Sequence, residues 1–149
     1  MAAIESASGY LWLQATLQAA SAVTSALPGG IWRGVAKAGS ATPYAVVGQQ
    51  APGKDIAGVA GHRLWHDVLF RISVWGPASD YAALVTAASA IDTALQRKSG
   101  EAPDSSAYIS SCVRESTLTP DSAPGSPGVT WATIIVVFRL HIVASGVPA

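Results

Sequence analysis

The chain has 149 residues, of which 50% are hydrophobic and only 12% are charged. This length predicts one domain with one hydrophobic core, and this composition excludes a disordered polyelectrolyte. Nine basic and nine acidic residues cancel without any run of like charge, so the electrostatic pattern of a dedicated nucleic-acid-binding protein is missing. Since little charge is available to solvate a large surface, we expect part of the surface to meet a partner.

Cys112 is the single cysteine of the chain, so no disulfide can form within it. An unpaired cysteine is typical of a protein from a reducing compartment. Free cysteines usually behave as small apolar side chains, and we therefore expect Cys112 to be buried.

An uncharged segment, residues 6–32, raises the question of a membrane span or a signal peptide. Gln14 and Gln18 dilute its hydrophobicity, and Glu5 precedes it where a secretory signal would carry basic residues. The segment is predicted to be an amphipathic helix outside any membrane, ended by Pro28-Gly29-Gly30. Its apolar residues recur every three or four positions: Tyr10, Leu13, Leu17, Ala20, Val23 and Leu27.

Two short strands are predicted over 31–36 and 44–48, followed by a long mobile loop near 49–61. The segment from Gly48 to Lys54 is one residue short of the phosphate loop of nucleotide hydrolases. A working phosphate loop needs a helix after it and a Ser or Thr directly after the Lys. Asp55 takes the hydroxyl position, and residues 56–61 are too short and glycine-rich for a helix. We therefore interpret the segment as a connection between strands and predict no nucleotide cofactor.

Residues 63–75 show the clearest strand pattern in the chain. Its predicted core face consists of alternate apolar residues: Val68, Phe70, Ile72 and Val74. Gly76-Pro77 ends the strand, and a helix is predicted from an N-cap at Ser79 to Arg97 and Lys98, closed by Gly100. The apolar stripe of that helix consists of Tyr81, Leu84, Val85, Ala88, Ile91 and Leu95.

A polar connector over 101–106 leads to a strand over 108–118 and to a second mobile loop near 119–129, which contains three prolines. In the last predicted strand, 131–143, one apolar face consists of Ile134, Val136, Phe138, Leu140 and Ile142. This order of elements predicts a single α+β domain over 1–149. Its expected architecture is a mostly antiparallel sheet of about four to five strands with two main helices packed on it.

No residue pattern predicts a catalytic, cofactor or metal site. His62 and His66 straddle the start of a strand, where their spacing separates them by roughly 13 Å, so one metal ion cannot bridge them. We expect both to be exposed at the strand end, and we expect His141 to have a solvated or interface role. Serines are plentiful, but none lies in a nucleophile elbow, and no Cys–His or paired-carboxylate spacing stands out.

The order of the elements resembles the tail-completion, or tail-terminator, proteins of long-tailed bacteriophages. The resemblance rests on the leading helix, on Thr-Pro-Tyr-Ala-Val-Val over 42–47, and on the glycine- and proline-containing loop. It continues through the strand His-Asp-Val-Leu-Phe-Arg-Ile-Ser-Val-Trp over 66–75 and the helix over 80–95. In the closing strand over 133–143, Val137-Phe138-Arg139 is similar to the last strand of that family.

This resemblance implies a homo-oligomeric ring, commonly a hexamer, that caps the last ring of the tail tube and offers a surface to the neck. The implied partners are other copies of the chain, the tail tube protein and a neck or head-completion protein, with no sequence-specific nucleic acid and no membrane. The implied location is the head–tail joint of the virion, after assembly in the host cytoplasm. Such a role needs no active site or cofactor.

The sheet is predicted to carry apolar residues on the face opposite the core as well, where a solvated sheet would carry more charge. The candidate interface residues on that face are Leu69, Arg71, Trp75, Ile135, Val137 and Arg139. We expect them to pack against a neighbouring subunit or the tail. The alternative is that the first helix covers this face within the monomer.

Other roles also fit the sequence. A head-closure or connector protein is hardly separable from a tail terminator, and a small ligand-binding or enzymatic α+β domain is a more distant alternative. The loops near 49–61 and 119–129 are interpreted as plain surface loops or as segments that order against the tail. Trp12, Trp32 and Trp65 fit either a core or a contact surface.

Overall fold

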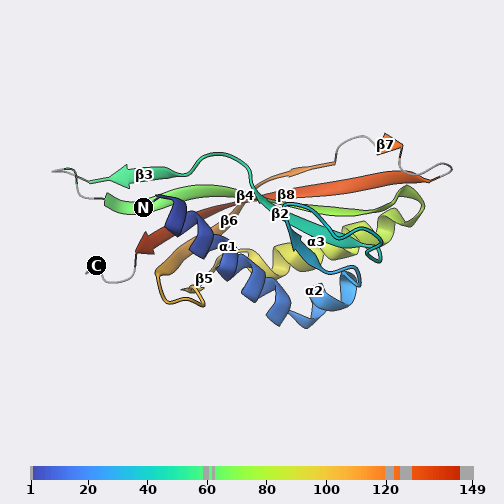
Figure 1. The fold of residues 1–149 in the computed structure, drawn as a ribbon, viewed down its shortest axis with the longest axis horizontal. Helices are drawn as coiled ribbons and strands as arrows, with labels where there is room; N and C mark the ends of the chain where they lie inside the picture. Colours follow the sequence, from blue (N-terminus) through green and yellow to red (C-terminus); the bar gives the residue numbers. More distant parts are fainter. Residues whose placement is uncertain (1, 59–60, 62, 120–122, 125–128, 145–149) are drawn as a thin grey trace.

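In the computed structural model, a long curved sheet carries its helices on one face (Figure 1). The structure describes residues 2–58, 61, 63–119, 123–124 and 129–144. The helices are α1 (Ala2–Ala19), α2 (Ser21–Ala26) and α3 (Tyr81–Leu95), with one turn of 3-10 helix at Ala78–Asp80. The strands are β1 (Ile31–Arg33), β2 (Tyr44–Gln49), β3 (Lys54–Ala57), β4 (Arg63–Pro77), β5 (Lys98–Glu101), β6 (Ala107–Leu118), β7 (Ala123–Pro124) and β8 (Thr130–Ala144).

The strands form one sheet in the order β1-β2-β4-β8-β6-β5. β1 runs parallel to β2, and every other neighbouring pair is antiparallel. Two further short strands extend the sheet: β3 pairs with β4 beyond the end of β2, and β7 pairs with β8. The α+β class and the mostly antiparallel sheet are confirmed. The described sheet has eight strands instead of the expected four to five, because the sequence did not predict β3, β5 or β7.

The two longest strands, β4 and β8, are antiparallel neighbours at the centre, paired from His66 with Ile142 to Pro77 with Trp131. Their alternation is as predicted, because the residues of both core faces are buried under the helices: Val68, Phe70, Ile72, Val74, Ile134, Val136, Phe138, Leu140 and Ile142. We call this helix-covered side the inner face of the sheet and the opposite side the outer face.

Helix α1 lies directly against the inner face. A Cβ added at Gly9 would come within 2.7 Å of Ile142 Cδ1 and 3.2 Å of Phe70 Cε2, so any larger residue would require these core side chains or α1 to shift. The prediction of a single first helix is wrong: the helix breaks at Ala20, whose backbone is extended, with φ −85° and ψ 107°. The break lets α2 turn and pack against α3, and the three-to-four-residue periodicity alone does not reveal it.

Helix α3 differs from its prediction at both ends. It begins at Tyr81 after the 3-10 turn instead of at an N-cap provided by Ser79, and no side chain caps its first turn. It ends at Leu95, and Arg97 instead of Gly100 adopts the left-handed conformation, with φ 59°. The reason is that Arg97 N donates to Cys112 O, which turns the chain directly into β5 and places Gly100 in that strand. Glu101, predicted in a polar connector, also belongs to β5.

The predicted apolar stripe of α3 is only partly buried. Leu84, Ile91 and Leu95 are fully buried, whereas Tyr81 and Val85 are 42% and 43% exposed. These two residues lie on the side of α3 that the sheet does not cover, and Ala87 is buried instead.

The loop near 49–61 was predicted without strands, but it contains β3, which pairs with the N-terminal end of β4. Because β4 is longer than β2, it offers a free edge there, and pairing with that edge overrides the turn-like composition. Most of the second loop, namely 120–122 and 125–128, lies outside the described residues, but β7 within it joins the sheet. The predicted strand over 31–36 ends at Arg33. Among the described helices, none has the length and apolarity needed to cross a bilayer.

Candidate functional site

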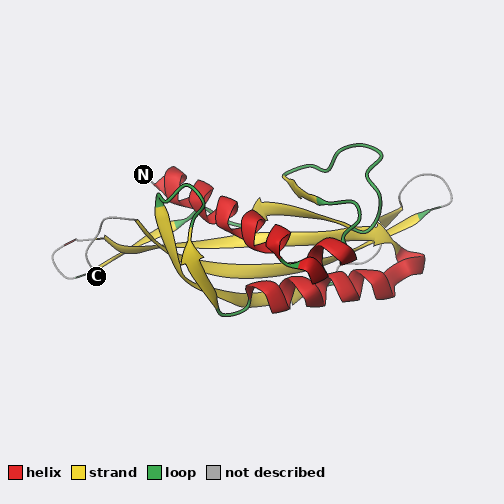
Figure 2. Ribbon diagram, turned by 90° about the horizontal axis from the view of Figure 1, so that it is seen from below, coloured by secondary structure: helices red, strands yellow, loops and turns green. Residues whose placement is uncertain are grey.

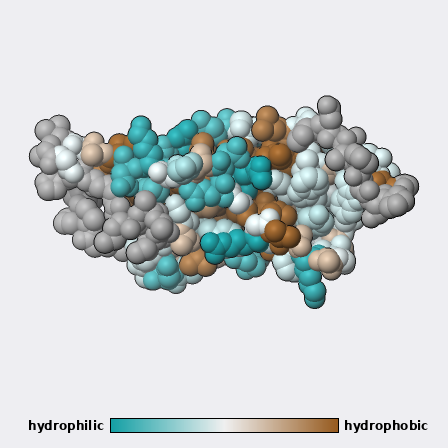
Figure 3. All heavy atoms as spheres, turned by 45° about the horizontal axis from the view of Figure 1, so that its top comes forward, coloured by the Kyte–Doolittle hydropathy of each residue, from teal (hydrophilic) through white to brown (hydrophobic). Residues whose placement is uncertain are grey.

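The six predicted interface residues come together on the outer face, which Figure 3 turns partly toward the reader. They belong to β4 and β8, and two cross-strand pairs join them: Leu69 with Arg139 and Arg71 with Val137. Farther along the same two strands, Ser73 is the partner of Ile135, and Thr133 is the partner of Trp75. All six alternate with residues of the buried inner face, which fixes the side of the sheet on which they lie.

Their exposure is unequal. Arg71 is exposed, and Leu69, Trp75 and Ile135 are partly buried, whereas Val137 is only 4% exposed. Val137 lies between Arg71 on β4 and Ser116 on β6, in the middle of the sheet, where neighbouring side chains already cover it. It therefore offers little area to another molecule.

No described helix covers the outer face (Figures 1 and 2). The tight approach of Gly9 to Phe70 and Ile142 places α1 on the inner face, together with α2 and α3. The alternative that the first helix covers the candidate residues within the monomer is therefore wrong. In the described part of the chain, the outer face is left to solvent or to a partner.

Arg139 is held by two carboxylates of its own chain. Its Nε and Nη2 donate to both oxygens of Glu115, each at 3.0 Å, and its Nη1 donates to Asp67 Oδ2 at 2.6 Å. The hydrogen bonds from Arg139 hold the pKa of Glu115 below its usual range, and the carboxylates, Glu115 first, raise the pKa of Arg139. Arg139 thus enters any interface as part of a fixed cluster, whereas Arg71 has no ion pair among the described residues.

His141 extends this cluster, on the face that the sequence predicts it to share with Arg139. Its Nε2 lies 3.7 Å from Asp67 Oδ1, its Nδ1 lies 3.2 Å from Ser111 Oγ, and its ring lies 5.7 Å from the ring of Trp65. Trp65 is therefore an outer-face residue, whereas Trp12 is buried in the core at 5% exposure. Trp32 is partly buried, and its Nε1 donates to Gly29 O.

Three outer-face residues were missed by the sequence reasoning. Tyr108, Val113 and Leu118 on β6 are 46%, 42% and 52% exposed, and they pair with Val143, Arg139 and Ile135 of β8. Alternation could have assigned Val113 to this face, but irregularities between Ile109 and Ser111 and between Arg114 and Ser116 shift the register of β6.

At one end of β4 the outer face is aromatic. Tyr44 is the cross-strand neighbour of Trp75 on β4, and its ring lies 6.2 Å from that of Trp131 on β8. The outer face thus combines an ionic cluster, scattered aliphatic residues and an aromatic end. Such a mixture is typical of protein–protein contact surfaces.

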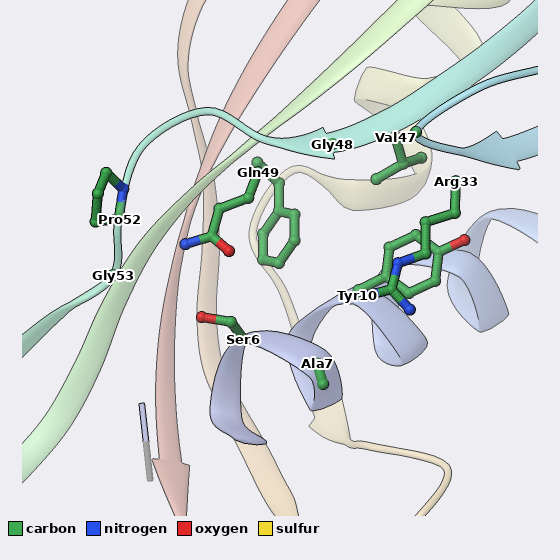
Figure 4. Close-up of a pocket in the computed structure, with 11 residues that line it drawn as sticks. Ser6, Ala7, Tyr10, Arg33, Val47, Gly48, Gln49, Pro52 and Gly53 are labelled. Atoms are coloured by element: carbon green, nitrogen blue, oxygen red, sulfur yellow. The ribbon is translucent and has the colours of Figure 1, made fainter. Parts of the chain in front are cut away.

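The inner side of the molecule contains a hollow of about 560 Å³ between α1 and the segment that joins β2 to β3 (Figure 4). Phe70 and Val47 contribute apolar walls, and the Arg33 guanidinium lies 4.8 Å over the ring of Tyr10. Burial raises the pKa of Tyr10, and the charge of Arg33 opposes that shift. The Gln49 amide donates to Ala51 O, so it braces the chain segment beside it.

Next to this hollow, three residues are arranged like a hydrolase triad. Ser6 Oγ lies 3.3 Å from His66 Nε2, and His66 Nδ1 lies 2.9 Å from Asp55 Oδ1. The prediction that His66 is exposed is wrong, because it is 1% exposed and a Cβ at Gly53 would overlap its ring. His62, its predicted companion, lies outside the described residues.

The triad-like arrangement lacks what acyl transfer needs. A catalytic histidine must exchange a proton with the substrate, but His66 is sealed beneath Gly53. Ser6 lies inside α1, where the following backbone N–H groups are engaged in the helix and cannot form an oxyanion hole. The contacts instead fasten α1 and β3 to β4.

The structure also accounts for the phosphate-loop-like segment, the candidate metal ligands and Cys112. Lys54 of the phosphate-loop-like segment opens a strand, β3, so no helix N-terminus follows it to bind phosphate. In the described residues, no three His, Cys, Asp or Glu side chains gather as a metal site would require. Cys112 is buried as expected, and burial raises the pKa of its thiol to about 12.

Comparison with known proteins supports a tail protein. The family model described as Tail completion protein gp17 matches residues 12–136. Among curated proteins, none matches the sequence significantly. A solved chain from the virion of a native gene transfer agent particle has 19% sequence identity and a TM-score of 0.66, over 87% of this chain and 90% of that one. Another solved structure, whose name describes no function, has 14% identity and a TM-score of 0.52 over 92% and 96%.

At these identities the two solved structures show a shared fold and nothing more. The family model is stronger evidence, because its match runs from the middle of α1 into β8 and so includes both central strands of the sheet. This chain therefore belongs to the Tail completion protein gp17 family and is a structural protein of the phage tail, not an enzyme.

Proposed function

We propose that the chain forms a homo-oligomeric ring that caps the phage tail tube and provides the tail's surface for the neck. The family to which the chain belongs completes tails, and a chain of similar fold belongs to the virion of a gene transfer agent. A capping protein works through contact surfaces alone, which fits a chain whose triad-like residues serve packing.

One observation carries this proposal: the described helices all lie on the inner face, and the broad outer face stays uncovered (Figures 1 and 2). Val113 and Leu118 are exposed there, and Leu69, Trp75 and Ile135 are partly buried among them. In this proposal the outer face contacts a neighbouring copy or the tube. Burying exposed apolar surface of this kind favours assembly.

The test is a capping assay with purified tail-tube protein, in which tube length and tube ends are followed by electron microscopy. The wild-type chain should stop tube growth and leave a ring on the tube end. Val113→Asp introduces a charge on the outer face and should abolish capping. Leu11→Asp is the matched control, because Leu11 on α1 is 39% exposed against 42% for Val113, and it should cap normally.

Capping by Val113→Asp at the wild-type level would overturn the role of the outer face. A folded wild-type chain that associates neither with itself nor with tubes would overturn the capping proposal itself. Binding to the neck protein without any effect on tubes would instead assign the chain to head closure.

A further inference from the structure

The segment between β1 and β2, residues 34–43, projects from one edge of the sheet, and we call it the arm. In Figure 2 it stands clear of the helices as a loop at the top. Cβ atoms added at Gly34 and Gly39 would meet nothing within 4 Å, so at these positions the arm lies in open space. Val35 is 81% exposed, the highest value among the large apolar residues described as exposed.

The opposite edge of the molecule carries a groove between α3 and the end of β6, with a volume of about 340 Å³. Tyr81, Val85 and Ala88 of α3 form one wall, and Ile134 and Val136 of β8 contribute apolar surface below. This α3 groove explains why two residues of the predicted stripe are exposed. The exposed side of α3, with Tyr81 and Val85, faces the groove. α1 and the arm both lie on the other side of α3 (Figure 2).

The arm carries one charged side chain, the basic Lys37, whereas both charged residues of α3 and the turn before it, Asp80 and Asp92, are acidic. Arg114, which also lines the groove, pairs with Asp92. Between residues 6 and 53 the only charged side chains are Arg33 and Lys37, both basic and both exposed. Between residues 76 and 96 the only charged side chains are Asp80 and Asp92, both acidic. Asp92 Oδ2 accepts a hydrogen bond from Arg114 at the groove, while Oδ1 has no hydrogen-bond partner among the described residues.

The two surfaces belong to unlike edges of one sheet, since β1 is the first strand in the sheet order and β6 lies next to the last. A contact between unlike surfaces of identical chains repeats from copy to copy, and it closes into a ring when the rotation between copies allows closure. A contact between like surfaces would stop at a dimer. The placement of the arm and the α3 groove thus suits a ring.

We propose that the arm of one copy lies in the α3 groove of the next, with Val35 against Tyr81 and Val85 and with Lys37 near Asp80 and Asp92. This inference rests on the proposed ring and names the contact that builds it. It also assigns separate tasks to separate surfaces: the edges join copies, and the outer face remains for the tube.

The experiment is cysteine crosslinking between copies. A Val35→Cys chain is mixed with a Val85→Cys chain under ring-forming conditions, with tail tubes present, and treated with a short bis-maleimide. The expected product is a crosslinked dimer on a denaturing gel, and a chain with both substitutions should give a ladder that ends at the ring size. Native Cys112 is buried, so it contributes no background.

Two matched mixtures serve as controls. Val35→Cys with Leu11→Cys and Val35→Cys with Val113→Cys pair the arm with residues of similar exposure to Val85 on α1 and on the outer face, and neither should crosslink. Rings visible by electron microscopy without the Val35–Val85 crosslink would overturn the arm contact while the proposed function stands. If the chain associates neither with itself nor with tubes, both proposals fall.

Discussion

Arg139 and Glu115 face each other across β8 and β6 and are joined by two parallel hydrogen bonds, each 3.0 Å long. The second anchor of Arg139, Asp67, comes from β4 on the other side. One guanidinium therefore ties three adjacent strands of the outer face together. Arg suits this task because its planar fork matches two carboxylates at once.

The Arg139–Glu115 pair should make stability depend on pH. Because Arg139 lowers the pKa of Glu115, the pair stabilises the fold above the ordinary glutamate pKa, and this contribution is lost as the pH falls through the lowered value. Glu115→Gln should reduce the free energy of unfolding at pH 7 by about 0.5 kcal/mol, the usual size for an exposed pair, and by less at about pH 3. Urea unfolding of both proteins at the two pH values measures this difference. Glu101→Gln on β5 is the control, and an equal loss at both pH values would contradict the explanation.

Gly9 should tolerate no branched side chain. In Gly9→Val the Cβ would meet Ile142 Cδ1 at 2.7 Å and Phe70 Cε2 at 3.2 Å, so either these buried side chains or α1 must shift. We expect a loss of about 1–3 kcal/mol in the free energy of unfolding, as is usual for overpacked cores. Ala15→Val, on the exposed side of the same helix, should cost only the small helix-propensity difference. Equal urea midpoints for the two variants would show that α1 does not depend on this approach.

Ser6 should be chemically inert. A fluorophosphonate probe, which labels activated serines, should label the wild-type chain no more than Ser6→Ala. The reason is that His66 is only 1% exposed and α1 offers no oxyanion hole beside Ser6. His66→Ala should still destabilise the chain by about 1–3 kcal/mol, because it leaves a cavity and removes the partner of Ser6 and Asp55. Stoichiometric labelling of Ser6, detected by mass spectrometry, would contradict the packing role.

Cys112 should react only after unfolding. Burial raises the pKa of its thiol to about 12, so the thiolate is scarce at pH 8 and reagents cannot reach the sulfur. Ellman's reagent should give no absorbance change with the folded chain and one equivalent in urea. The Val35→Cys variant should react at once in the folded state, because Val35 is 81% exposed. Rapid reaction of the native chain would show that β6 opens readily.

Val35→Asp should separate folding from assembly. An exposed residue of the arm contributes little to the core, so we expect the urea midpoint to stay at the wild-type value. The charge would face acidic Asp80 and Asp92, so ring formation should fall at least tenfold in apparent affinity, measured by sedimentation velocity. Leu11→Asp should keep wild-type assembly. Normal rings from Val35→Asp would remove the arm from the contact.

The central part of the fold could be predicted because β4 and β8 alternate so regularly. Phe70 and Phe138, for example, were assigned to the core from spacing alone, and both are buried. The resemblance to tail-completion proteins also rested on these strands, and the family match confirms it. The outer-face residues followed from the same alternation, although their role as an interface stays a prediction.

The parts that could not be predicted depend on tertiary contacts. Ala20 is a good helix former, yet the chain breaks there so that α2 can reach α3. Lys54–Ala57 has no strand pattern of its own and pairs because β4 extends past β2. His66 looked like a strand-end residue, but α1 and Gly53 cover it. Glu115 was missed as the partner of Arg139 because the register of β6 shifts between Arg114 and Ser116.

β4 and β8 each span the joint between two shorter strands: β4 pairs with β2 and then β3, and β8 pairs with β6 and then β7. The short outlying strands thus pair only with the end parts of β4 and β8, and β3 is also held by the contact between Asp55 and His66 (Figure 1). Short peripheral strands generally open at a lower free energy than the centre of a sheet. The ends of the sheet can therefore open while its middle stays folded.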